Sequence, residues 1–163
     1  MTPIVAFLLL VAILAIHAGW RGGAPERLAA AAMLVATIAT SLTNMQVALT
    51  FRDVQWSIVW IDAALLAALL AIALRANRFW PLWVAAIQCL ALAAHAARAF
   101  DADILPLAYW WIVGKLSYPM LLLLIIGTER HHRRCRHGHR DPAWSLASQG
   151  RAPPPQHETT PGP

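Results

Sequence analysis

Apolar stretches of about the length of a helix alternate with short polar segments along this chain. Short polar loops separate five apolar stretches, which cover residues 3–18, 28–50, 54–74, 79–99 and 105–126. A helix needs roughly 20 mostly apolar residues to cross about 30 Å of hydrocarbon, and four of the stretches reach that length. Because the loops are short, consecutive helices should pack as antiparallel neighbours. The pattern predicts an all-α bundle of about five transmembrane helices.

The composition supports a membrane protein and leaves room for one folded domain. Hydrophobic residues make up 59% of the 163 residues and charged residues 13%, whereas soluble domains have roughly 45–50% and about 25%. We therefore expect a transmembrane domain over residues 1–127. Residues 128–163 are polar, basic and proline-rich, and such a segment cannot bury enough apolar surface to fold. We expect it to form a disordered tail.

The arginines predict the orientation of the bundle. Two of the loop arginines, Arg52 and Arg98, fall on one side of the predicted membrane. The other side carries Arg21, Arg27, Arg75, Arg78, Arg130, Arg133, Arg134, Arg136, Arg140 and Arg151. The positive-inside rule then predicts the N-terminus outside and the C-terminus in the cytoplasm. The same distribution explains the net charge of +5 without nucleic-acid binding. The abundance of arginine and alanine is typical of a GC-rich bacterial genome, so we expect the bacterial inner membrane.

The first apolar stretch has the short apolar core of a signal peptide, so a cleaved signal peptide is the alternative to a membrane-spanning helix. No basic residue precedes it, and the best cleavage candidate, Ile16-His17-Ala18, lacks a small residue at its first position. We expect a retained membrane anchor.

A few polar residues lie inside the predicted spans. Asp62 and Lys115 fall roughly 12–15 Å deep at 1.5 Å per residue, and such a charge costs on the order of 2.5–3.5 kcal/mol. His95, Arg98 and Asn44 are predicted in the same outer half. One interpretation is a hydrated pocket in which Asp62 binds a cation or relays a proton. The other is an Asp62–Lys115 ion pair that ties helices together in a closed bundle.

The segment after the fifth stretch is rich in arginine and histidine. Arg130, Arg133, Arg134 and Arg136 are expected to contact anionic lipid, at about 1 kcal/mol for each basic residue near the surface. Histidines and Cys135 lie among them. These residues do not have the spacing of a zinc finger, and the nearby positive charges repel a metal cation. We predict no metal site and no cofactor.

The sequence contains no HExxH, no GxSxG and no glycine-rich phosphate loop. The expected function is therefore that of a non-catalytic accessory, assembly or partner-binding membrane protein. The alternative is a small oligomeric transporter or ion-coupled protein that uses Asp62, Lys115 and His95, and an intramembrane enzyme that uses His95 and Asp62 is a third hypothesis. The expected partners are the lipid bilayer and a membrane protein or a second copy of the chain.

Overall fold

The computed structural model describes residues 3–47, 56–100, 106–137 and 144, and all regular secondary structure in these residues is helical. The helices are α1 (Pro3–Arg21), α2 (Ala24–Val47), α3 (Trp56–Arg75), α4 (Trp80–Phe100) and α5 (Pro106–Arg136). The predicted all-α fold is confirmed.

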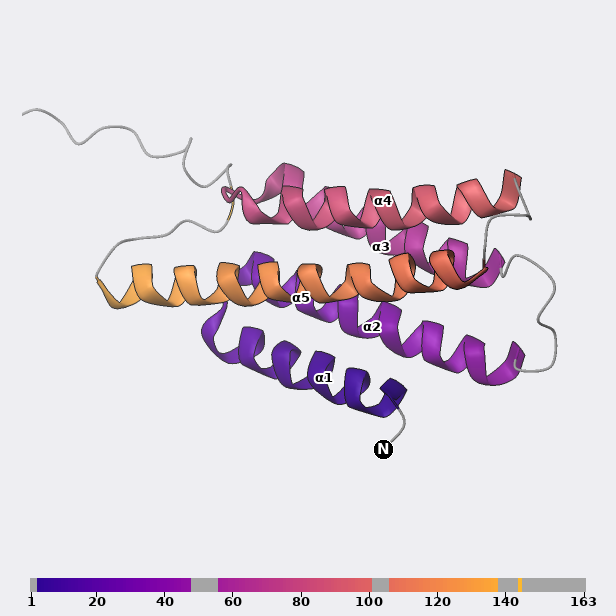
Figure 1. Ribbon diagram of the computed structural model, residues 1–163. Coiled ribbons are helices and arrows are strands. Elements are labelled where there is room, and N and C mark those ends of the chain that lie inside the picture. Colours follow the sequence, from indigo (N-terminus) through magenta and orange to yellow (C-terminus); the bar gives the residue numbers. More distant parts are fainter. Residues whose placement is uncertain (1–2, 48–55, 101–105, 138–143, 145–163) are drawn as a thin grey trace, which may run out of the picture.

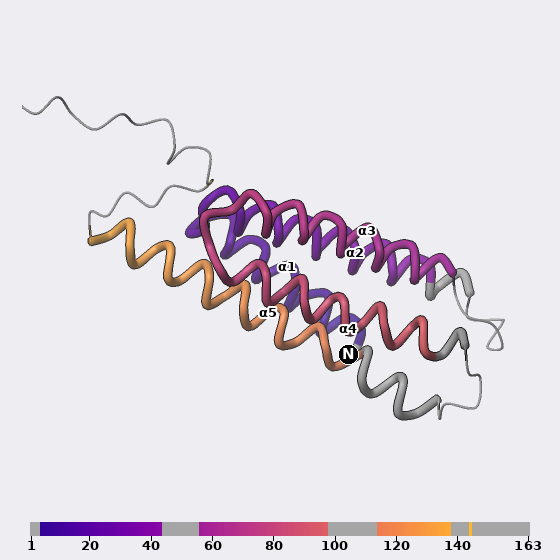
Figure 2. The backbone as a smooth tube through the Cα atoms, turned by 90° about the horizontal axis from the view of Figure 1, so that it is seen from above, coloured from indigo at the N-terminus to yellow at the C-terminus, as the bar shows by residue number. Residues whose placement is uncertain are grey.

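The five helices run roughly along one axis, and consecutive helices point in opposite directions (Figure 1). Packing follows the chain order from α1 to α4, and α5 then returns to contact α4, α1 and α2. In Figure 2, α2 and α3 lie side by side while α5 runs along α4. Helix α5 therefore closes the bundle, and one end gathers the α1–α2 loop, the α3–α4 loop and the C-terminal half of α5.

Four helices, α1 to α4, are long and apolar enough to cross a membrane. Many of their large side chains point outward, among them Ile13, Leu74 and Leu90. A soluble protein would expose this much continuous apolar surface at a high cost, whereas lipid tails solvate it. The chain has the helices of a membrane protein.

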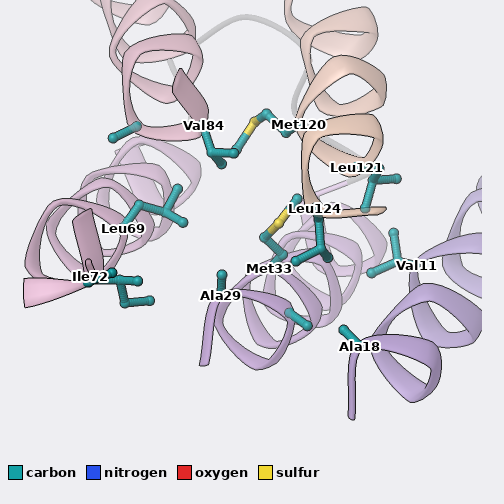
Figure 3. Close-up of a cluster of buried hydrophobic side chains, with 13 residues drawn as sticks. Val11, Ala18, Ala29, Met33, Leu69, Ile72, Val84, Met120, Leu121 and Leu124 are labelled. Atoms are coloured by element: carbon teal, nitrogen blue, oxygen red, sulfur yellow. The ribbon is translucent and has the colours of Figure 1, made fainter. Parts of the chain in front are cut away.

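The interior of the bundle is filled by apolar side chains from all five helices (Figure 3). Leu69, Val84 and Leu124 are at most 2% exposed, and Met33 and Met120 pack around them. In lipid the hydrophobic effect between helices is weak, so close packing supplies the attraction.

Two small residues, Ala29 and Gly127, lie where helices pack against each other. Ala29 of α2 is completely buried. At Gly127 of α5, an added Cβ would lie only 2.8 Å from ring atoms of Trp80. The glycine therefore lets the start of α4 lie directly against the α5 backbone.

The C-terminal end of α5 differs from the prediction. The sequence predicts that the fifth stretch ends at residue 126 and that a disordered tail begins at 128, yet the helix continues to Arg136. Residues 128–136 are therefore helical, and Glu129 and His131 contact α1 and the α3–α4 connection at the same end of the bundle. Apart from Trp144, the predicted tail beyond residue 137 lies outside the described residues. Trp144 forms an isolated antiparallel bridge with Ala76 and packs against the apolar interior.

Candidate functional site

Two of the predicted intramembrane residues, Asp62 and His95, meet between α3 and α4. Asp62 lies six residues after the start of α3 and His95 five residues before the end of α4, which places them about 9 Å and about 7.5 Å from the same end of the bundle. Nε2 of His95 lies 2.8 Å from Oδ2 of Asp62, at ion-pair distance but without the alignment of a hydrogen bond. Their side chains are 5% and 18% exposed.

Gln88 extends this contact by one more residue. Its side chain is 3% exposed, and its Nε2 donates a hydrogen bond to the backbone carbonyl of Asp62 at 3.3 Å. Gln88 and His95 lie two turns apart on one face of α4, so this face contacts α3 through both residues. We call Asp62, His95 and Gln88 the outer cluster, after the outer half of the bundle in which the sequence predicts the intramembrane polar residues.

Lys115 lies on α5 and has an exposed side chain. Its Nζ sits 5.4 Å from the ring centroid of Tyr118, one turn further along the helix. Such cation–π contacts are worth about 0.5–1 kcal/mol at exposed sites. The side chains of Arg98 and Asn44 lie outside the described residues, so their predicted place in the cluster stays a prediction.

The opposite end of the bundle holds a second polar network, centred on a completely buried carboxylate. Glu26 is 0% exposed and is the third residue of α2. Its Oε2 accepts a hydrogen bond from the backbone N–H of Gly23 at 3.0 Å. A glutamate at this position that binds the N-cap amide forms one half of a capping box, and its negative charge complements the positive end of the helix dipole.

The other oxygen of Glu26 binds the α3–α4 connection. Oε1 accepts hydrogen bonds from Nη1 of Arg78 and from Nε1 of Trp80, the latter at 3.0 Å. Arg78 is 6% exposed. A buried charge is tolerated when it is paired and hydrogen-bonded, and both conditions hold here.

The same arginine reaches α5. Nη2 of Arg78 lies 2.8 Å from Nδ1 of His131. A guanidinium can only donate, so Nδ1 must be the acceptor and the proton of a neutral His131 must be on Nε2. These contacts join α2, the α3–α4 connection and α5. We call Glu26, Arg78, Trp80 and His131 the inner cluster, after the side of the membrane that the arginines predict for this end.

A third set of contacts joins α1 to α5 beside the inner cluster. Nε2 of His17 donates to Oε1 of Glu129 at 2.9 Å, and Nη1 of Arg21 lies 3.5 Å from the same oxygen. The hydrogen bond from His17 holds the pKa of Glu129 below its ordinary value, and the charge of Arg21 acts in the same direction. The side chains of His17 and Glu129 are each 32% exposed, so this contact is partly screened by solvent.

The residues predicted to contact anionic lipid lie on the C-terminal part of α5, at the end that also carries the inner cluster. All four are exposed: Arg130, Arg133, Arg134 and Arg136. Arg21, Arg27 and Arg75 are exposed at the same end. The sequence predicts ten arginines on the cytoplasmic side of the membrane. Those among them that the structure describes all lie at this one end of the bundle.

Sequence reasoning missed Glu26. The apolar pattern begins the second stretch at residue 28 and so places Glu26 in a loop, and Arg78 enters the sequence prediction only through the orientation. The signal was present, because Gly23-Ala24-Pro25-Glu26 places an early helical proline and a glutamate three residues after a cap. The partners of Glu26 carried no local signal, since they lie 52 and 54 residues away.

Neither cluster offers a set of metal ligands. Among the described residues, no group of three or more His, Cys, Asp or Glu side chains could hold a metal ion. Comparison of the chain with protein-family models, curated proteins and solved structures found no match. The described bundle holds a carboxylate–imidazole contact at Asp62 and His95 and a buried, hydrogen-bonded ion pair at Glu26 and Arg78.

Proposed function

We propose that this chain is a non-catalytic accessory membrane protein that binds a partner, and that it crosses the bacterial inner membrane about five times. The observation that carries this proposal is the apolar layer between the two polar clusters. Leu69, Val84 and Leu124 are fully or almost fully buried there. An ion or proton path needs a chain of polar groups or water, and this packed layer favours a scaffold over a conduit.

The polar clusters fit the same role. The outer cluster joins α3 to α4, and the inner cluster joins α2, α5 and the α3–α4 connection. Within lipid, polar contacts between helices contribute about 0.6 kcal/mol each on average. Several such contacts fix the helix rotations and hold the outer surface of the bundle in one shape.

The arginines favour an orientation with the N-terminus outside and the C-terminus in the cytoplasm. In this orientation the inner cluster and the C-terminal part of α5 face the cytoplasm, which obeys the positive-inside rule. The exposed arginines of α5 would then lie at the membrane surface, where anionic headgroups attract them.

The partner-binding surface that we propose is this C-terminal part of α5. Its helix continues from Ile126 to Arg136 and presents an exposed, positively charged surface. A photoreactive amino acid at Arg133 should crosslink to a membrane-protein partner or to a second copy in living cells. The same group at the exposed Ile13 of α1 serves as the lipid-facing control.

A discrete adduct from position 133 that is missing from position 13 supports the proposal. A monodisperse monomer that gives no protein adduct from either position contradicts it. The mass of the adduct separates a second copy of the chain from a different partner.

The outer cluster supports a second candidate, a small oligomeric ion- or proton-coupled protein. Asp62 and His95 lie 2.8 Å apart and are largely buried, and intramembrane ionisable residues are functional candidates by default. Lys115 belongs to this candidate as a charge on α5. Ion- or pH-driven flux in liposomes that is abolished by Asp62→Asn would establish it.

A further inference from the structure

We propose that the C-terminal part of α5 is held on the bundle by a latch that opens when His131 binds a proton. The latch consists of the contact between Arg78 and His131, backed by the buried carboxylate of Glu26. This inference takes the cytoplasmic placement of this end from the proposed function, and it does not depend on the partner-binding role.

The geometry requires His131 to be neutral. Nδ1 of His131 accepts from Nη2 of Arg78 at 2.8 Å, and a protonated imidazole has no acceptor to offer. Protonation would turn Nδ1 into an N–H donor that faces the N–H donor of Arg78, and it would put a positive imidazolium beside the positive guanidinium. The side chain of Arg78 is 6% exposed. Histidine changes its charge between about pH 5 and about pH 8, so a change in cytoplasmic pH can reach this contact.

The surroundings leave little space for His131 to move while it stays docked. A Cβ on Gly23 would lie 3.1 Å from Nε2 of His131, 3.2 Å from Nη2 of Arg78 and 3.2 Å from Oε2 of Glu26. The α1–α2 loop therefore packs against the imidazole on its Nε2 side. Repulsion at Nδ1 is relieved most directly by movement of the helix that carries His131.

The other charged groups around His131 determine whether the latch opens. Glu26 belongs to the same cluster as His131, and its oxygens already bind Gly23, Arg78 and Trp80. On α5 itself, Sγ of Cys135 lies 3.6 Å from Nε2 of His131, and His132 and Glu129 are neighbours along the helix.

The α1 contacts oppose the opening. Protonation of His17 would strengthen its bond to Glu129, and Arg21 holds the same carboxylate. These side chains are 32% to 51% exposed, so solvent screens their attraction. The repulsion beside buried Arg78 is screened much less. We therefore expect the opening effect of His131 to exceed the closing effect of His17.

The latch can be tested by a spin-label distance in the full chain in lipid nanodiscs. Labels at Asn77→Cys and Arg133→Cys measure the distance between the α3–α4 connection and α5. The native cysteines are removed by Cys89→Ser and Cys135→Ser. A second pair at Ile13→Cys and Leu70→Cys reports whether the rest of the bundle stays intact. All four labelled positions are exposed.

Between about pH 8 and about pH 5, the fraction of long Asn77–Arg133 distances should rise at least about threefold, with the Ile13–Leu70 distance unchanged. His131→Gln keeps an acceptor for Arg78 without a titrating ring, so it should stay docked at both values. His131→Arg should stay open at both, and His17→Gln should still open in acid.

Identical distance distributions of the parent at both pH values overturn the proposal. A parent-like response of His131→Gln also overturns it, because another group would then be responsible. If His131→Arg fails to fold, the comparison of the parent with His131→Gln decides alone.

Discussion

Trp80 donates a hydrogen bond from Nε1 to Oε1 of Glu26 at 3.0 Å, which joins the first turn of α4 to the first turn of α2. The two residues are 54 positions apart, and neither is part of an outward-facing apolar surface. Through this bond the cap of α2 also positions α4. The carboxylate of Glu26 thus serves local helix capping and long-range packing at once.

Removal of this carboxylate should strongly destabilise the bundle. Glu26→Gln leaves Arg78 buried without its counter-charge, and breaking a buried ion pair in this way costs about 3–5 kcal/mol. Thermal unfolding in detergent measures the effect. Replacement of both partners, Glu26→Gln with Arg78→Met, should recover part of the loss because no lone charge remains. An unchanged unfolding temperature for Glu26→Gln would show that the inner cluster does not hold the helices.

The contact between Gly127 and Trp80 predicts a second stability effect. Gly127→Ala places a methyl group 2.8 Å from the indole ring, and overpacking of this kind costs about 1–3 kcal/mol. Gly19→Ala is the matched control, because no atom lies within 4 Å of the added carbon and alanine is the better helix former. The two variants should therefore shift the unfolding temperature in different directions. Equal shifts would contradict the close approach of α4 and α5.

The pKa of Glu129 predicts how the α1–α5 contact depends on pH. Because the hydrogen bond from His17 lowers this pKa, the contact stabilises the fold at pH values above the ordinary pKa of a glutamate. The stabilisation is lost as the pH falls through the lowered pKa of the folded state. The difference in unfolding temperature between the parent and Glu129→Gln should therefore be present near neutral pH and vanish in strong acid. A difference that persists unchanged in strong acid would contradict this assignment.

The outer cluster predicts energetic coupling between Asp62 and His95. A double-mutant cycle with Asp62→Asn and His95→Gln should give a coupling energy of about 0.5–3 kcal/mol, as expected for residues in contact. The same cycle with Lys115→Gln in place of His95→Gln is the comparison, and we expect weaker coupling there. Stronger coupling to Lys115 would favour the Asp62–Lys115 ion pair predicted from the sequence.

Sequence patterns predicted the helices of this fold better than its polar contacts. The apolar stretches gave five helices because lipid imposes a minimum length, and four of them are apolar enough to span. The ends were less predictable: α2 begins at Ala24 and α5 continues to Arg136, since caps and long-range contacts stabilise polar turns that composition assigns to loops.

The candidate sites show the same division. Asp62 and His95 were grouped by their depth, and they do lie together, because depth follows from position along a helix. The rotation of each helix is set by packing, which a single sequence does not encode locally. The pairing of Glu26 with Arg78 and Trp80 depends on such rotations and on the return of α5, so only the folded bundle reveals it.

The central claim is that the bundle is a closed scaffold whose polar clusters hold helices together. The most direct measurement is proton and cation flux into liposomes that contain the purified parent protein or Asp62→Asn, under imposed pH and voltage gradients. We predict that both leak no faster than empty liposomes under every gradient. Flux through the parent that disappears in Asp62→Asn would contradict the claim and establish the ion-coupled alternative.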